Sequence, residues 1–147
     1  MRGGYTLCWV RMYYTMNNTI PVQTIETIVY IALFGALGAL LRYGFSFLPS
    51  LGGIPMGTLL VNLLGSFVLG FLTALLLTQN MSPALKTGLT TGFLGAFTTF
   101  STFTVESATL LQEHSSWLAG LNILGQVVGG LSMAMLGLYL GGRWSEN

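Results

Sequence analysis

Three long stretches of this chain carry no charged side chain. They lie between Arg42 and Lys86, between Lys86 and Glu106, and between His114 and Arg143. An α-helix needs about 20 apolar residues to cross a bilayer. Charged side chains make up only 6% of the chain, whereas soluble domains contain roughly 25%. The uncharged stretches therefore predict an all-α integral membrane protein.

The chain has room for four transmembrane helices, which we predict at residues 24–47, 56–78, 84–112 and 117–140. They would form a single membrane domain covering residues 24–142, and the 20 glycines favour close packing between helices. Residues 1–23 are expected to be a tail that is disordered or not native, with a native start near Met12 or Met16. Residues 143–147 are expected to be a short C-terminal tail.

The segment Thr90–Phe103, with the sequence TTGFLGAFTTFSTF, is poorly suited to remaining helical. Gly92 and Gly95 loosen the backbone, and the hydroxyl side chains compete for its hydrogen bonds. At membrane depth, a broken helix is tolerated only where protein or a water-filled cavity satisfies the freed N–H and C=O groups. We therefore predict that the third helix is broken here and that the break holds an ion or substrate site.

Four phenylalanines of this segment recur three or four residues apart and would line one face of a continuous helix: Phe93, Phe97, Phe100 and Phe103. Aromatic residues at this spacing most often reflect packing. The alternative is that their ring edges, which carry partial positive charge, contact a small anion. A lysine or arginine at the same depth would bind an anion too tightly for rapid release.

Polar side chains also recur on two other predicted helices, at Thr58, Asn62, Ser66 and Thr73 on helix 56–78 and at Asn122 and Gln126 on helix 117–140. Hydrogen bonds between membrane helices, worth about 0.6 kcal/mol each, would explain both stripes. A continuous polar line would equally serve as a path for an ion. Spacing alone leaves these two interpretations open.

The sequence contains no arrangement typical of an enzyme: no paired carboxylates, no nucleophile with a base and no phosphate-binding glycine loop. We therefore expect no catalytic residues, and no nucleic-acid partner. The single Cys8 rules out an internal disulfide and a cysteine metal cluster. Glu106 is expected at the water interface, and His114 is a loop histidine without ligand partners. Arg42 either draws anions into a vestibule or anchors its helix.

Three blocks of the sequence resemble the Fluc (CrcB) family of fluoride channels. They are GALGALLRY at Gly35–Tyr43, GTLLVNLLGSF at Gly57–Phe67 and TTGFLGAFTTFSTFTVE at Thr90–Glu106. The third block is highly specific to that family. The resemblance covers about Thr24 to Gly142, and the last helix matches by position and hydropathy rather than by motif.

This resemblance implies an antiparallel, dual-topology homodimer with two fluoride pathways and one structural sodium ion at its centre. Backbone carbonyls of Gly95 and Thr98 would hold the sodium ion. Together with the polar stripes, the resemblance implies a fluoride pathway that includes Arg42, Thr58, Asn62, Ser66, Phe100, Ser101, Thr102, Phe103, Asn122 and Gln126.

We therefore expect passive, selective export of fluoride across a bacterial plasma or inner membrane. One alternative is a small multidrug-type exporter, which needs a membrane-embedded carboxylate to trade protons against a cationic drug. The predicted first helix has only Glu26, near its end. The other alternative is a non-conducting assembly subunit, which has no need of a broken helix. Lys86 and Arg143 on one side against Arg42 on the other form a weak orientation bias, compatible with insertion both ways.

Overall fold

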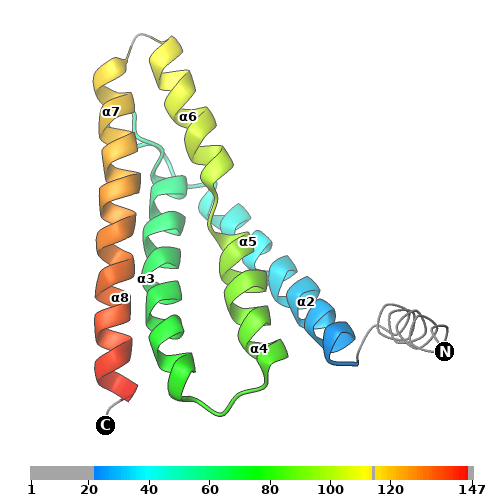
Figure 1. Ribbon diagram of the computed structural model, residues 1–147. Helices are drawn as coiled ribbons and strands as arrows, with labels where there is room; N and C mark the ends of the chain where they lie inside the picture. Colours follow the sequence, from blue (N-terminus) through cyan, green and yellow to red (C-terminus); the bar gives the residue numbers. More distant parts are fainter. Residues whose placement is uncertain (1–21, 114, 146–147) are drawn as a thin grey trace, which may run out of the picture.

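The computed structural model describes residues 22–113 and 115–145, so most of the predicted N-terminal tail, His114 and the last two residues lie outside the described part. Within these ranges the chain is helical, apart from turns and an isolated bridge between Leu51 and Ile54. The elements, labelled in Figure 1 where space allows, are α2 (Val22–Phe45), α3 (Met56–Thr78), α4 (Pro83–Thr87), η1 (Gly88–Leu94), α5 (Gly95–Phe97), α6 (Phe100–Gln112), α7 (Ser116–Leu124), η2 (Gly125–Gly129) and α8 (Gly130–Ser145).

Three helical stretches are long and apolar enough to cross a membrane: Thr24–Phe45, Met56–Leu76 and Ser116–Trp144. Their mean hydropathies are 1.9, 2.2 and 1.7. The stretch from α4 to α6 is also helical over most of its length, but it is interrupted at Thr98 and Thr99. The fold is therefore that of an all-helical integral membrane protein.

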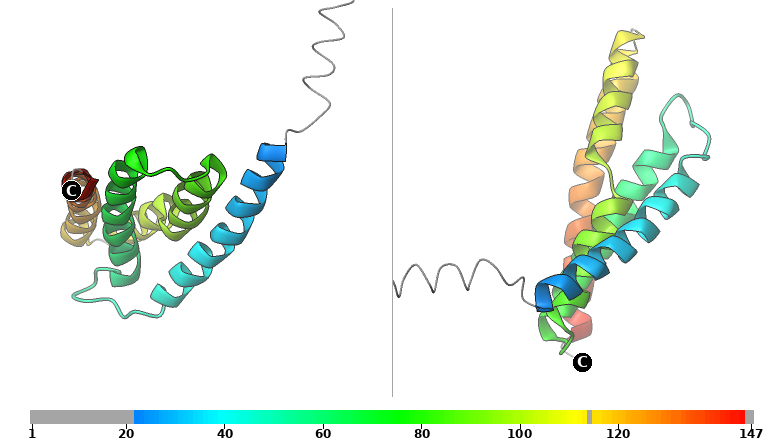
Figure 2. Two further views of the ribbon diagram at one scale, coloured as in Figure 1. Left: turned by 90° about the horizontal axis from the view of Figure 1, so that it is seen from below. Right: turned by 90° about the vertical axis from the view of Figure 1, so that its right-hand side faces the viewer.

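The helices form a curved row rather than a closed bundle, as the view along them shows (Figure 2, left). Along this row α8 lies beside α3, the α4–α5 stretch follows, and α2 lies at the far edge. The main packing pairs are α3 with α8, α2 with η1, and α6 with α7. The C-terminus lies at the same end of the molecule as the turn between α3 and α4 (Figure 1).

Glycine brings neighbouring helices into direct backbone contact. An added Cβ at Gly137 of α8 would lie only 2.1 Å from the carbonyl oxygen of Phe67 in α3. A Cβ at Gly70 of α3 would lie 2.3 Å from a carbonyl oxygen of α8, and one at Gly38 of α2 would lie 2.2 Å from a carbonyl oxygen of η1. Any side chain at these positions would push the helices apart, as is typical of glycine interfaces in membrane proteins.

The last helix extends beyond its predicted end. Although residue 140 is followed by two glycines, α8 continues to Ser145, so part of the predicted C-terminal tail is helical. Gly141 packs against α3 so closely that an added Cβ would lie 2.4 Å from the carbonyl oxygen of Phe71. We attribute the extension to this contact, because packing against a neighbour offsets the low helix propensity of glycine.

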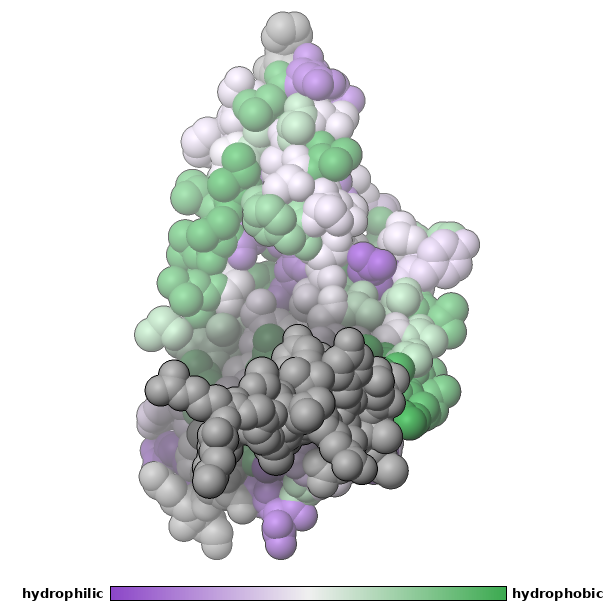
Figure 3. All heavy atoms as spheres, turned by 45° about the vertical axis from the view of Figure 1, so that its right-hand side comes forward, coloured by the Kyte–Doolittle hydropathy of each residue, from purple (hydrophilic) through white to green (hydrophobic). Residues whose placement is uncertain are grey.

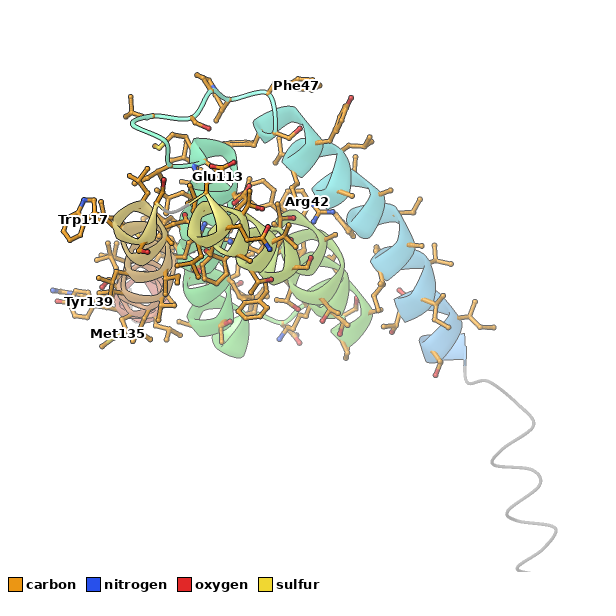
Figure 4. The ribbon with its side chains drawn as sticks, turned by 90° about the horizontal axis from the view of Figure 1, so that it is seen from above. Arg42, Phe47, Glu113, Trp117, Met135 and Tyr139 are labelled. Carbon is orange, nitrogen blue, oxygen red and sulfur yellow. The ribbon has the colours of Figure 1, made fainter. Side chains whose placement is uncertain are left out.

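Most large apolar side chains point away from the rest of the chain. Leu40 is 66% exposed and Trp117 is 75% exposed, whereas the buried apolar residues are few and small in number beside them. Trp117, Met135 and Tyr139 point outward from α7 and α8 (Figure 4). A soluble monomer rarely exposes so much contiguous apolar surface, so lipid or another chain covers it.

Candidate functional site

The chain between α5 and α6 changes from helical to extended at two residues. Thr98 has φ −80° and ψ 156°, and Thr99 has φ −148° and ψ 119°. The Thr98 N–H still donates to the Leu94 carbonyl oxygen at 3.0 Å, as it would in a helix. In an unbroken helix the Thr99 N–H would donate to the Gly95 carbonyl. Here it turns toward α3 instead, so helical hydrogen bonding stops at Thr99.

Asn62 of α3 provides the hydrogen-bond partners that the helix no longer gives to Thr99. Its Oδ1 accepts the Thr99 N–H at 2.8 Å, and its Nδ2 donates to the Thr99 carbonyl oxygen at 2.9 Å. Nδ2 also donates to Oε1 of Gln126 at 2.8 Å. A side-chain amide has two N–H groups, so both donors of Asn62 are already used within the chain.

The bonds to Thr99 also determine how the neighbouring amide is oriented. A backbone N–H can only donate, so the Asn62 atom that faces it is oxygen and the other is nitrogen. That nitrogen requires an oxygen from Gln126, which leaves the Gln126 nitrogen without this partner. Gln126 is 7% exposed, and its Nε2 has no hydrogen-bond partner within the described ranges. The site therefore contains a buried amide whose two N–H groups are unused.

A π-helical turn, η2, contains Gln126. Such turns insert an extra residue into a helix and are frequent at functional sites, because they change which way the following side chains face. Asn122, which precedes η2, faces α6 instead and donates to Oγ of Ser107 at 3.0 Å. Its Oδ1 is buried and has no hydrogen-bond partner in the described chain. The two amides of this stripe therefore serve different neighbours.

Three of the four polar residues predicted to form a stripe on α3 face this region. Thr58 donates to Oε1 of Glu106 at 2.6 Å, Asn62 binds Thr99, and Ser66 lines the larger cavity described below. Thr73 is exposed and donates to a carbonyl oxygen of its own helix at 2.7 Å. Thr73 therefore lies outside the site, because its hydroxyl is satisfied locally.

Glu106 differs from its predicted placement at the water interface. Its side chain turns toward α3, where Oε1 accepts the Thr58 hydroxyl, and Oε2 is buried without a hydrogen-bond partner among the described residues. The polar face of α3 explains this orientation, because it offers a donor that the apolar outer surface lacks. Glu106 nevertheless lines neither of the two cavities beside the interruption.

Two cavities flank the interruption, and Thr99 lines both. The larger has a volume of about 480 Å³ and its wall includes Asn62, Ser66, Phe100, Phe103 and Gln126. The smaller has a volume of about 280 Å³ and its wall includes Arg42, Ser46, Thr58 and Thr102. Seen from outside, hydrophilic residues gather midway along one face between apolar flanks (Figure 3).

The two cavities differ in charge. Among the described residues that line the smaller cavity, Arg42 alone is charged, and it reaches from α2 toward the neighbouring helices (Figure 4). No charged residue of the described chain lines the larger cavity. The smaller cavity can therefore attract anions from solution, whereas the larger one must bind an ion with neutral groups.

The interruption divides the four phenylalanines into two pairs, so the predicted single face is wrong. Phe93 and Phe97 stack before it with ring centroids 6.1 Å apart, and Phe100 and Phe103 meet edge to face after it at 5.6 Å. The two extended residues between the pairs break the helical register. Phe103 is buried, Phe100 is 75% exposed, and both line the larger cavity.

The interruption also creates two helix ends of opposite polarity. Thr99 caps α6, because its Oγ1 accepts the Thr102 N–H at 3.2 Å; it also lies 3.0 Å from Oγ1 of Thr102 and 3.3 Å from Oγ of Ser101. The start of α6 carries partial positive charge, and the end of α5 carries partial negative charge. Electrostatics therefore favours an anion beside α6 and a cation beside α5.

Sequence reasoning located the segment but missed the residue that organises it. Thr99 was not among the candidate residues, although it receives both Asn62 bonds and caps α6. One signal was available: Thr99 stands three residues before Thr102, the spacing of an N-cap. The π-helical turns η1 and η2 left no comparable signal, because a widened turn depends on the neighbouring helices rather than on local composition.

The fold and the site define a small, multi-pass helical membrane protein with an uncharged, amide-lined cavity at a helix interruption. The sequence model of the family described as "CrcB-like protein, Camphor Resistance (CrcB)" matches residues 29–138. The chain therefore belongs to the CrcB family, as its three sequence blocks indicated, and it is a multi-pass protein of the cell membrane.

Similar proteins carry names that refer to an ion channel and not to an enzyme. The fluoride-specific ion channel FluC 1 of Staphylococcus aureus is 48% identical over 118 residues, which cover 80% of this chain and 98% of that protein. The fluoride-specific ion channel FluC of Methanococcus maripaludis is 50% identical over 111 residues, which cover 75% and 91%. FluC 1 of Staphylococcus epidermidis is 44% identical over 118 residues, which cover 80% and 98%.

Proposed function

We propose that this protein is a channel through which fluoride leaves the cell passively. The observation that carries the proposal is the uncharged cavity of about 480 Å³, whose wall holds the unused N–H groups of Gln126 and the rings of Phe100 and Phe103. Neutral donors can offset the loss of an anion's hydration without trapping it. The names of the similar channels support fluoride as the ion.

The proposed pathway begins in the smaller cavity, where Arg42 raises the local anion concentration. The ion then passes the hydroxyls around Thr99, contributed by Thr58, Ser101 and Thr102, and enters the larger cavity. There Gln126 donates to it, Ser66 and the two phenylalanine edges complete the wall, and Asn62 shapes it. Asn122 lines neither cavity, so its part in the pathway is to support α6 through Ser107.

We also propose a structural sodium ion at the end of α5. The Gly95 carbonyl loses its helical donor because the Thr99 N–H binds Asn62. The Thr98 carbonyl loses its own because the Thr102 N–H binds Oγ1 of Thr99. Freed carbonyl oxygens at the negative end of a helix suit a hard cation, so Gly95 and Thr98 fit the role.

Both halves of the site open toward the outside of the chain, which supports an antiparallel homodimer. Gly95 is exposed, and an added Cβ there would meet only the Thr90 carbonyl oxygen, at 3.8 Å. Phe100 is 75% exposed. A second copy in the opposite orientation would cover both residues and double the number of carbonyls beside the sodium ion. It would build between chains the inverted repeat that larger transporters build within one.

Purified protein in liposomes tests the proposed function. Vesicles loaded with fluoride should release it when the membrane potential is clamped to zero, and vesicles loaded with chloride should retain their ion. No gradient of protons or sodium should be needed. Equal release of both halides would contradict selectivity. No release of either ion would favour a non-conducting assembly subunit.

A proton-coupled exporter is the second candidate, because Glu106 is an inward-facing carboxylate. Such an exporter needs its carboxylate in the substrate path, and Glu106 lines neither cavity. The Glu106→Gln variant separates the two functions. A channel should still conduct fluoride in this variant without any pH gradient, whereas an exporter should lose its response to the gradient.

A further inference from the structure

We infer that Asn62 is a positioning residue: it holds the interruption between α5 and α6 in place through Thr99 and orients Gln126, and it offers no N–H of its own to the ion. The part that concerns the ion rests on the proposed function, whereas the part that concerns Thr99 does not.

The first step is the match between the two groups. The Asn62 amide presents an acceptor and a donor side by side, and Thr99 presents a donor and an acceptor in the same order. Thr99 is 7% exposed, so bulk water does not serve its backbone groups. Unpaired backbone groups at membrane depth are costly, so the extended conformation of Thr99 depends on this pairing.

The second step is a count of hydrogens. Nδ2 of Asn62 has two, one on the Thr99 carbonyl oxygen and one on Oε1 of Gln126. An ion could take either hydrogen only by breaking a bond that holds the site together. Gln126 has two N–H groups without a partner in the described chain, in the wall of the same cavity. The ion therefore meets Gln126 rather than Asn62.

Three nearly isosteric substitutions separate these roles. Asn62→Leu removes both bonds to Thr99. Asn62→Asp keeps an acceptor for the Thr99 N–H but removes the donors and adds a negative charge. Gln126→Met leaves both bonds between Asn62 and Thr99 intact and removes only the free donors.

Amide hydrogen exchange of the full-length protein in lipid bicelles, resolved by NMR, tests the effect on Thr99. The Thr99 N–H should exchange at least roughly tenfold faster in Asn62→Leu than in the wild type. It should stay protected in Asn62→Asp and in Gln126→Met. The Thr98 N–H is the internal control, because it donates to Leu94 and not to Asn62. Equal protection of Thr99 in Asn62→Leu and the wild type would overturn the inference. If Asn62→Leu fails to fold, loss of protection in Asn62→Asp would overturn it.

A fluoride titration of the wild type tests the effect on the ion. The side-chain N–H resonances of Gln126 should shift with fluoride and not with chloride, while those of Asn62 stay in place. Gln126→Met should lower fluoride efflux from liposomes by roughly tenfold or more. Shifts at Asn62 alone would overturn this part. If the wild type passes no fluoride, the proposed function fails, and the exchange of Thr99 still decides whether Asn62 positions it.

Discussion

At the scale of the residue, the hydroxyl of Thr99 does work that its backbone does not. The backbone of Thr99 is bound by Asn62, and its Oγ1 accepts the Thr102 N–H at the start of α6. The side chain thereby satisfies one of the N–H groups that every helix leaves free at its beginning. The same residue ends one hydrogen-bonding pattern and begins the next.

Replacement of Thr99 by valine keeps the shape of the side chain and removes the cap. We expect Thr99→Val to lower the free energy of unfolding by about 1 kcal/mol, the usual effect of losing an N-cap. Thr99→Ser keeps the hydroxyl and should be close to the wild type. Denaturation in detergent, followed by circular dichroism, measures both. A valine variant as stable as the serine variant would contradict the capping role.

Phe100 offers a second test at this scale, because its ring borders the larger cavity and is 75% exposed. We expect Phe100→Ile to slow fluoride efflux roughly tenfold, which corresponds to about 1.4 kcal/mol at the barrier. Isoleucine fills similar space and lacks the positive ring edge. Phe47, which is 71% exposed and lines neither cavity, is the matched control. Phe47→Ile should conduct like the wild type, and equal losses in both variants would argue against a role for the ring edge.

At the scale of the element, the α3–α8 pair is the rigid wall on which the polar cluster is mounted. Gly70, Gly137 and Gly141 let the two backbones approach directly. This contact keeps α3 in a constant relation to η2, and it thereby brings Asn62 and Gln126 within hydrogen-bond distance. Packing far from the cavity thus contributes to the geometry of the cavity.

Gly137→Ala tests this contact with a single methyl group. Its Cβ would lie 2.1 Å from the carbonyl oxygen of Phe67, so α8 must move away from α3. We expect a loss of about 1–3 kcal/mol in stability, as for other overpacked positions. Gly120→Ala is the control, because an added Cβ there has no neighbour within 4 Å. Thermal melting in detergent should show a lower midpoint for Gly137→Ala alone; two equal midpoints would contradict the close contact.

At the scale of the whole molecule, the chain is incomplete as a permeation structure. Its helices form a curved row with polar groups on a concave stretch and apolar groups outside (Figures 2 and 3). Gly95 and Phe100, which stand on the two sides of the interruption, are both exposed. The proposed second copy would turn this open row into an enclosed path.

Gly95→Val tests whether another chain packs at the interruption. An added Cβ at Gly95 meets nothing closer than 3.8 Å within the chain, so the fold of one protomer should tolerate it. We expect a smaller dimer fraction in cross-linking and single-molecule bleaching experiments, and less fluoride efflux. Gly44→Val adds the same side chain at a position with no neighbour within 4 Å, and it should leave the dimer unchanged. An unaffected dimer in Gly95→Val would place the interface elsewhere. Thr98→Ser should be mild, because the proposed sodium contact uses the main chain.

The sequence determined the membrane class and the family, because uncharged runs and specific blocks are local properties that need no knowledge of neighbours. It also indicated which segment resists helix formation, since glycines and hydroxyl-bearing residues weaken a helix wherever it packs. The residues Asn62 and Gln126 could be nominated because polar side chains are rare in helices that cross lipid. What each of them does could not be predicted from spacing.

Only the tertiary structure decided where the helix stops and which groups remain free. The interruption falls at Thr99 because Asn62, 37 positions away in the chain, satisfies its backbone. The same bonds use up the donors of Asn62 and leave those of Gln126 unused. The inward turn of Glu106 likewise depends on Thr58, which lies 48 positions earlier. A hydrogen bond couples groups by distance in space, whereas periodicity records only distance along the chain, so the direction of these side chains emerges when the helices pack.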